Sequence, residues 1–388
     1  MYHVLMFAVL LLASFITLQH PASARDADNQ FQSIASKADK ARESERLNDA
    51  LNLYSEGVKL HPTWADGWWW LGSILYDQDR FREASVPFEK FIALSPKPFP
   101  AYALLALCEY ETGEYDKSLK NFQMWAKGGS PGNDALLDVA GFHWALLLTR
   151  HAQFNQALFL LAAKAQKLGP SPNLTEAMGL ASLRLANLPQ ECPPEKREAV
   201  WLAGSAALYS AVSQPALAND YASRLLAHYG QEPNVHYFRG TLFTFQKDWD
   251  SAAEEYEKEL GISPTNAPAL VELAVARLEG FQPGEAVAPA RRALALDPNS
   301  ARGHYILGRA LQQTGSWSAS IPELERARTL APDSARVRYA LFTVYKHLGR
   351  AEDAKRELAA FQLLKDKEEV LAPLDEKLKA PAKPGSNP

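Results

Sequence analysis

The sequence has little cysteine and no excess of positive charge. Only two of its 388 residues are cysteines, which excludes a small fold framed by disulfide bonds. Lys and Arg total 41 against 45 Asp and Glu, and the formal net charge is -4. Nucleic acid is therefore not an expected partner, because binding its phosphates requires clustered cationic side chains.

Motifs that carry catalysis or bind metal are also missing from the sequence. It contains no H-E-x-x-H, C-x-x-C or G-x-S-x-G pattern and no phosphate-binding glycine loop. The nine histidines are scattered, and His143 and His151 are too far apart along one predicted helix to share a metal ion. We therefore expect no catalytic residues, no metal and no cofactor, and predict that the protein is not an enzyme.

The one long apolar run lies at the N-terminus, from Val4 to Leu18. A membrane-spanning helix needs about 20 apolar residues, and here small residues follow in an A-x-A pattern that ends at Ala24. This pattern predicts a signal peptide over residues 1–24 and a protein exported to the periplasm or secreted, with no stable membrane span after cleavage. The N-terminal region lacks Lys and Arg before Arg25, so an uncleaved membrane anchor is the alternative.

A pattern with a period of 34 residues runs through much of the chain. The segments 65–98, 267–300 and 301–334 share small residues at positions 8 and 20, an apolar residue at position 24 and a proline at position 32. The small residues allow two helices to approach closely, and the proline ends the second helix. The residues at position 8 are Gly72, Ala274 and Gly308, and those at position 20 are Ala84, Ala286 and Ser320. Position 24 has Phe88, Ala290 and Leu324, and position 32 has Pro96, Pro298 and Pro332.

This pattern resembles the tetratricopeptide repeat (TPR) family. The resemblance implies an all-α fold, a TPR-type α–α superhelix in which antiparallel helix pairs stack as a solenoid. It extends over three units in residues 31–132 and four in residues 233–368, although Arg239 and Phe342 depart from the pattern.

We predict that residues 133–232 form a divergent TPR-like helical region. Residues 369–388 are predicted to form a capping segment followed by a disordered tail. A disulfide between Cys108 and Cys192 is not expected, because they lie roughly two repeats apart and the Cα atoms of a disulfide lie within about 7 Å. The helices predicted in the divergent region are Asp138–Arg150, Gln153–Lys167, Leu174–Ala186, Glu195–Ser213 and Pro215–Tyr229, with a proline-rich loop at 187–194.

In TPR proteins the first helix of each unit lines a concave groove. The resemblance therefore implies a groove that is aromatic throughout, acidic in its early units and basic in its late ones. Its candidate binding residues are Asp66, Trp69, Ser73, Tyr76, Asp77, Tyr110, Glu111, Tyr237, Thr241, Arg302, Tyr305, Arg309, Arg336, Tyr339 and Lys346.

Three consecutive tryptophans cannot all point the same way on a helix. We expect Trp68 in the core and Trp69 in the groove; the alternative is that groove residues are simply solvated and that Trp69 packs on neighbouring units. The expected function is a scaffold that binds an unidentified partner protein or peptide, because Tyr, Trp and Arg dominate interface energies. Two alternatives are a self-associating structural envelope protein and an accessory of a cell-envelope enzyme.

Overall fold

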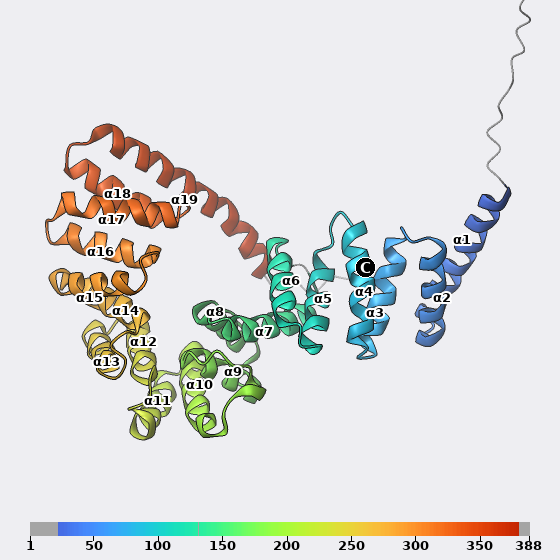
Figure 1. Cartoon of the computed structure of the whole chain (residues 1–388), viewed down its shortest axis with the longest axis horizontal. Coiled ribbons are helices and arrows are strands. Elements are labelled where there is room, and N and C mark those ends of the chain that lie inside the picture. Colours follow the sequence, from blue (N-terminus) through green and yellow to red (C-terminus); the bar gives the residue numbers. More distant parts are fainter. Residues whose placement is uncertain (1–21, 131, 380–388) are drawn as a thin grey trace, which may run out of the picture. The chain divides into compact units, whose positions relative to one another are not determined.

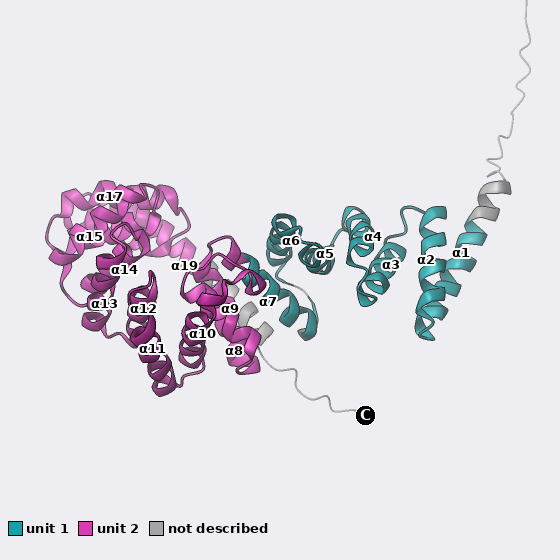
Figure 2. Ribbon diagram, turned by 60° about the horizontal axis from the view of Figure 1, so that its bottom comes forward, with its two compact units in different colours: residues 1–147 teal, residues 148–388 magenta. Residues whose placement is uncertain are grey.

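A computed structural model describes residues 22–130 and 132–379 of the chain. These residues form α-helices and two short 3-10 turns, with no β-strand among them (Figure 1). The chain divides into two compact units, Met1–Leu147 (unit 1) and Leu148–Pro388 (unit 2), and the boundary falls within helix α7 (Figure 2).

Unit 1 consists of helices joined by short turns. Its first six helices form the three pairs predicted for residues 31–132, and each pair packs in an antiparallel arrangement. Their bounds are α1 (Ala22–Glu43), α2 (Leu47–Leu60), α3 (Ala65–Asp77), α4 (Phe81–Leu94), α5 (Phe99–Glu111) and α6 (Tyr115–Lys127), followed by α7 (Asp134–Arg150).

Unit 2 ends in the four helix pairs predicted from the repeat. The helices before them are α8 (Phe154–Leu168), α9 (Pro172–Ser182), α10 (Arg197–Ala211) and α11 (Pro215–Tyr229). The four pairs are α12 (Val235–Gln246) with α13 (Trp249–Ile262), α14 (Ala267–Glu279) with α15 (Pro283–Leu296), α16 (Ala301–Gln313) with α17 (Trp317–Leu330), and α18 (Ala335–His347) with α19 (Ala351–Lys379).

The described residues include only part of the two terminal segments for which the sequence made predictions. Most of the predicted signal peptide lies outside the described residues, and Ala22–Ala24 belong to α1. At the other end α19 continues through the predicted start of the capping segment to Lys379, and residues 380–388 of the predicted tail lie outside the described part. No helix in the described ranges is long and apolar enough to cross a membrane.

Glycine at position 8 faces a bulky side chain at position 24 of the same unit. A Cβ atom on Gly72 would lie 2.9 Å from the Phe88 ring, one on Gly240 would lie 2.7 Å from the Tyr256 ring, and one on Gly308 would lie 2.6 Å from Leu324. Real Cβ atoms do not make contacts this short. The prediction that small residues let the paired helices approach closely is therefore confirmed.

The side chain at position 4 has a second role besides the core packing predicted for it. Trp68 is only half-buried at the edge of the core, and its Nε1 donates a 2.8 Å hydrogen bond to the carbonyl oxygen of Pro62. Arg338 donates in the same way to the carbonyl of Pro332, at 3.2 Å. The sequence predicted a core position for Trp68 because of its size. The indole N–H has a further role, because it donates a hydrogen bond to a carbonyl group at the end of the preceding unit.

The divergent region contains a close helix crossing that the sequence did not predict. A Cβ atom on Gly179 of α9 would lie 1.9 Å from the carbonyl oxygen of Val200 on α10, and one on Gly204 would lie 1.8 Å from that of Thr175. Helix α9 therefore packs backbone to backbone against α10, which also packs on α11. The predicted helix Leu174–Ala186 ends early, at Ser182, and the loop after it forms the turns Pro189–Glu191 and Pro194–Lys196.

Both cysteines are buried free thiols. Cys108 belongs to unit 1 and Cys192 to unit 2. Burial raises the pKa of the Cys108 thiol to about 12, so it remains protonated at neutral pH.

Candidate functional site

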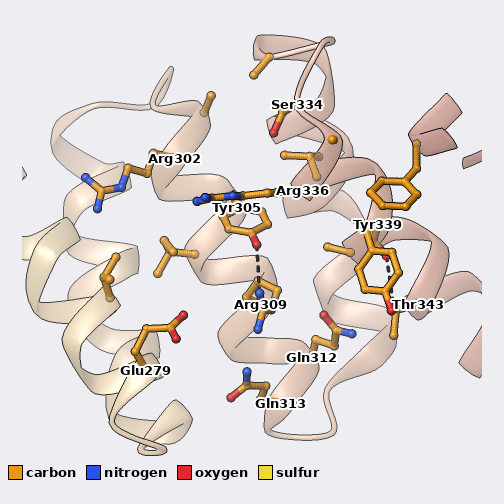
Figure 3. Close-up of a pocket in the computed structure, with 18 of the residues that line it drawn as sticks. Glu279, Arg302, Tyr305, Arg309, Gln312, Gln313, Ser334, Arg336, Tyr339 and Thr343 are labelled. Carbon is orange, nitrogen blue, oxygen red and sulfur yellow. Dashed lines mark hydrogen bonds between the residues drawn. The ribbon is translucent and has the colours of Figure 1, made fainter. Parts of the chain in front are cut away.

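A cavity of about 1060 Å³ opens among the last helices of unit 2 (Figure 3). Its walls come from the first helices α14, α16 and α18, and α19 adds Phe361 and Lys365. Of the predicted groove residues, this cavity brings together Arg302, Tyr305, Arg309, Arg336 and Tyr339.

The cavity lining is aromatic and mainly cationic. Its cations are three arginines and Lys365, whereas Glu279 is the acidic side chain on its wall. The aromatic surface comes from Tyr305, Tyr339 and Phe361. The ring of Tyr339 is 5.3 Å from that of Phe361 between centroids, which joins α18 to α19.

The three arginines of the cavity differ in their partners. Arg302 forms a two-point ion pair with Glu272 of α14, and Arg309 donates a 3.0 Å hydrogen bond to the hydroxyl of Tyr305, the contact dashed in Figure 3. The side chain of Arg336 is exposed and forms no hydrogen bond or ion pair with another described residue. Arg309 and Arg336 thus have no carboxylate partner among the described residues, and a ligand can neutralise Arg336 without breaking any side-chain hydrogen bond.

The predicted groove residue Lys346 is exposed on α18 but does not line the cavity. Its Nζ lies 5.8 Å from the centre of the Phe342 ring. Phe342, which replaces the small residue at position 8 of its unit, therefore packs partly exposed beneath this cation.

A second cavity, of about 550 Å³, also lies within unit 2. It is formed by α8, α9, α10 and α12, and it contains the predicted residues Tyr237 and Thr241. Tyr237 is buried rather than exposed, at 7%, and this burial raises the pKa of its hydroxyl to about 12. The hydroxyl of Thr241 donates to the carbonyl of Tyr237 at 3.0 Å, which leaves its methyl group for packing.

In unit 1 the predicted residues of α3 are held mainly by neighbours. The Trp69 ring lies 6.0 Å from Phe88 and 5.1 Å from Phe91, both on α4 of the same unit. The hydroxyl of Ser73 donates to the carbonyl of Trp69 at 2.9 Å, and the ring of Tyr76 meets that of Phe81 edge-on.

The two aspartates of α3, Asp66 and Asp77, are exposed. Partial burial of its carboxyl group nevertheless raises the pKa of Asp77 above its usual value. These two carboxylates are the acidic surface of α3 that the sequence predicted, whereas Trp69 acts at least in part as a packing residue.

Tyr110 and Glu111 form a small cluster with His143 of α7. The Tyr110 ring lies 4.7 Å from the His143 ring, and a Glu111 oxygen lies 3.9 Å from His143 Nε2. His143 Nδ1 is also 2.8 Å from the carbonyl oxygen of Val139. His143 of α7 therefore contacts both of these α5 side chains.

Sequence reasoning missed several residues that shape the two cavities. Phe361 and Lys365 lie on a second helix, whereas the repeat pattern assigns the groove to first helices. Glu272 lies at a repeat position to which the pattern assigns no role. The sequence could have indicated it only through its negative charge, which pairs with Arg302 in the next unit. Arg184 and Ser182 lie in the divergent region, where no repeat position guides an assignment.

No group of three or more His, Cys, Asp or Glu side chains in the described residues is placed to hold a metal ion. The side chains that line the two cavities offer apolar contact, hydrogen bonds and the charge of arginine.

Comparison with known proteins gives a family and a set of similar folds. A model of the tetratricopeptide repeat family matches residues 36–97, 204–267 and 271–335. Among solved structures, "MamA 41-end from Desulfovibrio magneticus RS-1" is 20% identical, covers 45% of this chain and 96% of its own, with a TM-score of 0.40. "Crystal structure of YrrB: a TPR protein with an unusual peptide-binding site" is 18% identical, covers 47% and 94%, with a TM-score of 0.39.

Proposed function

Because the chain belongs to the tetratricopeptide repeat family, we propose that it is a protein-interaction scaffold whose cavity among α14, α16, α18 and α19 binds an acidic peptide segment of a partner protein. The observation that carries this proposal is Arg336, an exposed guanidinium on the cavity wall without a partner among the described residues. A carboxylate binds such a group through two parallel hydrogen bonds.

The aromatic side chains add an apolar requirement for the peptide. Tyr305, Tyr339 and Phe361 offer ring surface at the same cavity as the arginines, and aromatic and arginine residues are the usual anchors of protein interfaces. A segment that places an acidic residue near a large apolar residue would satisfy both. Lys365 on the facing helix adds further positive charge.

The direct test is selection from a random peptide library on the chain from Arg25 to Pro388, which lacks only the proposed signal segment. Selected peptides should be enriched in Asp and Glu beside aromatic or aliphatic residues. Their affinities, measured by fluorescence anisotropy, should fall by about tenfold or more in Arg336→Glu, because charge reversal turns attraction into repulsion.

The matched control is Arg291→Glu on α15, an exposed arginine of the same unit that does not line the cavity. It carries the same change of net charge, so it should leave the affinities within about twofold of the original. Equal loss in both variants, or selected peptides without acidic residues, would show that the cavity does not recognise an acidic segment.

The proposal includes export, on the signal-like pattern of residues 1–24. Mass spectrometry of the N-terminal peptide from the native source tests this directly. A mature N-terminus at Arg25 would support cleavage, an intact Met1 in the membrane fraction would support an uncleaved anchor, and an intact Met1 in the cytosol would contradict export.

A further inference from the structure

The second cavity, among α8, α9, α10 and α12, has no role in the proposed peptide site. It lies wholly within unit 2 and has about 550 Å³ of space. Pockets for small organic ligands usually measure about 300 to 1,000 Å³, are mainly apolar and contain a few polar groups that orient the ligand. This cavity has all three features.

Its apolar surface is extensive and partly exposed to solvent. Phe159 on α8 and Phe245 on α12 are each 75% exposed, although both are large apolar side chains. Deeper in the lining, Met178 is buried on α9 and Leu242 on α12. A solvent-exposed pair of phenylalanines beside a buried apolar lining favours a ligand with an apolar body.

One polar group of the lining is buried without a partner. Ser182, the last residue of α9, is 3% exposed, and its hydroxyl has no hydrogen-bond partner in the described structure. A buried polar group without a hydrogen-bond partner destabilises the folded protein. A ligand atom that accepts a hydrogen bond from Ser182 would remove this destabilisation.

A positive charge lies two residues further along the chain. The guanidinium of Arg184 lies over two rings, 5.3 Å from the centre of Tyr237 and 4.7 Å from that of Phe154. It forms no ion pair with a carboxylate of the described residues. Ser182 and Arg184 are therefore two donors at the same end of α9, both in the cavity lining.

We propose that this cavity binds a single-chain amphiphile with a carboxylate head group, of which a fatty acid is the simplest example. The apolar chain lies between Phe159 and Phe245, and the carboxylate accepts hydrogen bonds from Ser182 and Arg184. One guanidinium and one hydroxyl match the single charge of a carboxylate better than the double charge of a phosphate monoester. A cationic head group would be repelled by Arg184.

The test is isothermal titration calorimetry of the chain from Arg25 to Pro388 with dodecanoate below its micelle concentration. One dodecanoate should bind per chain, and 1-dodecanol and dodecyltrimethylammonium, which keep the tail and change the head group, should bind at least about tenfold more weakly. Dodecyl phosphate should bind more weakly than dodecanoate. Equal affinity for dodecanoate and dodecanol would overturn the proposal.

Two variants locate the head group. Arg184→Gln keeps most of the side chain but removes the charge and should weaken dodecanoate binding about tenfold while leaving dodecanol binding unchanged. The matched control is Arg224→Gln, because Arg224 also lies over a tyrosine ring, 5.3 Å from the centre of Tyr221, but outside the cavity. Equal dodecanoate affinity in these two variants would overturn the assignment of Arg184.

Ser182→Ala provides a readout that a purely structural role would not give. The free protein should become slightly more stable, because a hydroxyl without a partner is removed, while dodecanoate binding weakens several-fold. Unchanged binding would overturn the assignment of Ser182. The result is independent of the peptide site, since Arg336→Glu should leave dodecanoate binding unaltered.

Discussion

Arg302 and Glu272 form a two-point ion pair that connects α16 to α14. One hydrogen bond, from Arg302 Nη2 to Glu272 Oε2, measures 2.7 Å, and the side chain of Glu272 is only 12% exposed. Although burial alone would lower the pKa of Arg302, the neighbouring Glu272 raises it. The pair holds Arg302 at the cavity wall and neutralises it, so the charge available to a partner comes from Arg336 and Arg309.

Glu272→Gln should therefore separate stability from binding. The variant leaves Arg302 without its countercharge, and unit 2 should lose about 1 kcal/mol of unfolding free energy, because Arg302 is half-exposed and stays hydrated. The affinity for acidic peptides should rise, because the cavity gains a net positive charge. Urea denaturation and fluorescence anisotropy measure the two effects, and a fall in peptide affinity would contradict this view of Arg302.

Trp69→Ala should reduce stability more than it reduces binding. The Trp69 ring packs on Phe88 and Phe91, so its removal should cost about 2 to 4 kcal/mol. Hydrogen exchange of the whole chain, followed by mass spectrometry, should show faster exchange in α3 and α4. If hydrogen exchange in α3 and α4 were identical in the variant and the original protein, Trp69 would not be a packing residue, and its assignment to the groove would stand.

Gly179→Ala should be strongly destabilising although it adds a single methyl group. That carbon would lie 1.9 Å from the carbonyl oxygen of Val200, so α9 and α10 would have to separate. We expect a loss of about 3 kcal/mol or more. The control is Gly261→Ala on α13, which meets nothing within 4 Å and should be neutral or stabilising by up to about 1 kcal/mol. Similar melting temperatures for the two variants would contradict the close crossing.

Glu109 should make unit 1 less stable as the pH rises. Burial raises the pKa of its carboxyl group from 4.5 to about 7, although a hydrogen bond from Asn121 opposes the shift. Between these values the folded state holds a proton that the unfolded state has lost, so stability falls across this range and is constant above it.

Glu109→Gln should remove this dependence and stabilise unit 1 by roughly 1 to 3 kcal/mol at pH values above about 7. The unfolding free energy of unit 1 can be measured at each pH from the hydrogen-exchange rates of α5 and α6 during denaturation. An unchanged pH profile in the variant would show that another group is responsible.

The repeat pattern predicted the fold well, because a few short-range rules decide it. Each glycine at position 8 needs a large neighbour sixteen residues later, as Gly72 has in Phe88, and this relationship can be read from sequence alone. In the divergent region, Gly179 and Gly204 approach backbone carbonyls instead, so no large side chain reveals the contact.

The site was only partly predictable for a related reason. Repeat positions identified Arg302, Tyr305 and Arg336 as residues of one surface, and all three line one cavity. The same positions could not tell that Trp69 finds two rings on α4, since this depends on which residues α4 presents. Nor could they find Phe361, because α19 lies outside the first-helix rule.

Some contacts at unit borders repeat with the period of the sequence. His304 has its Nδ1 2.7 Å from Glu323 of its own unit and its Nε2 3.1 Å from the carbonyl oxygen of Pro298 in the preceding one. Arg338, one period later, makes the equivalent contacts to Glu357 and Pro332. If residues 301–334 were deleted as a block, Arg338 would meet Pro298 in place of Pro332. This contact at position 4 therefore passes from one unit border to the next, whereas the ion pair of Arg328 with Glu357 belongs to one border and would be lost with the deleted unit.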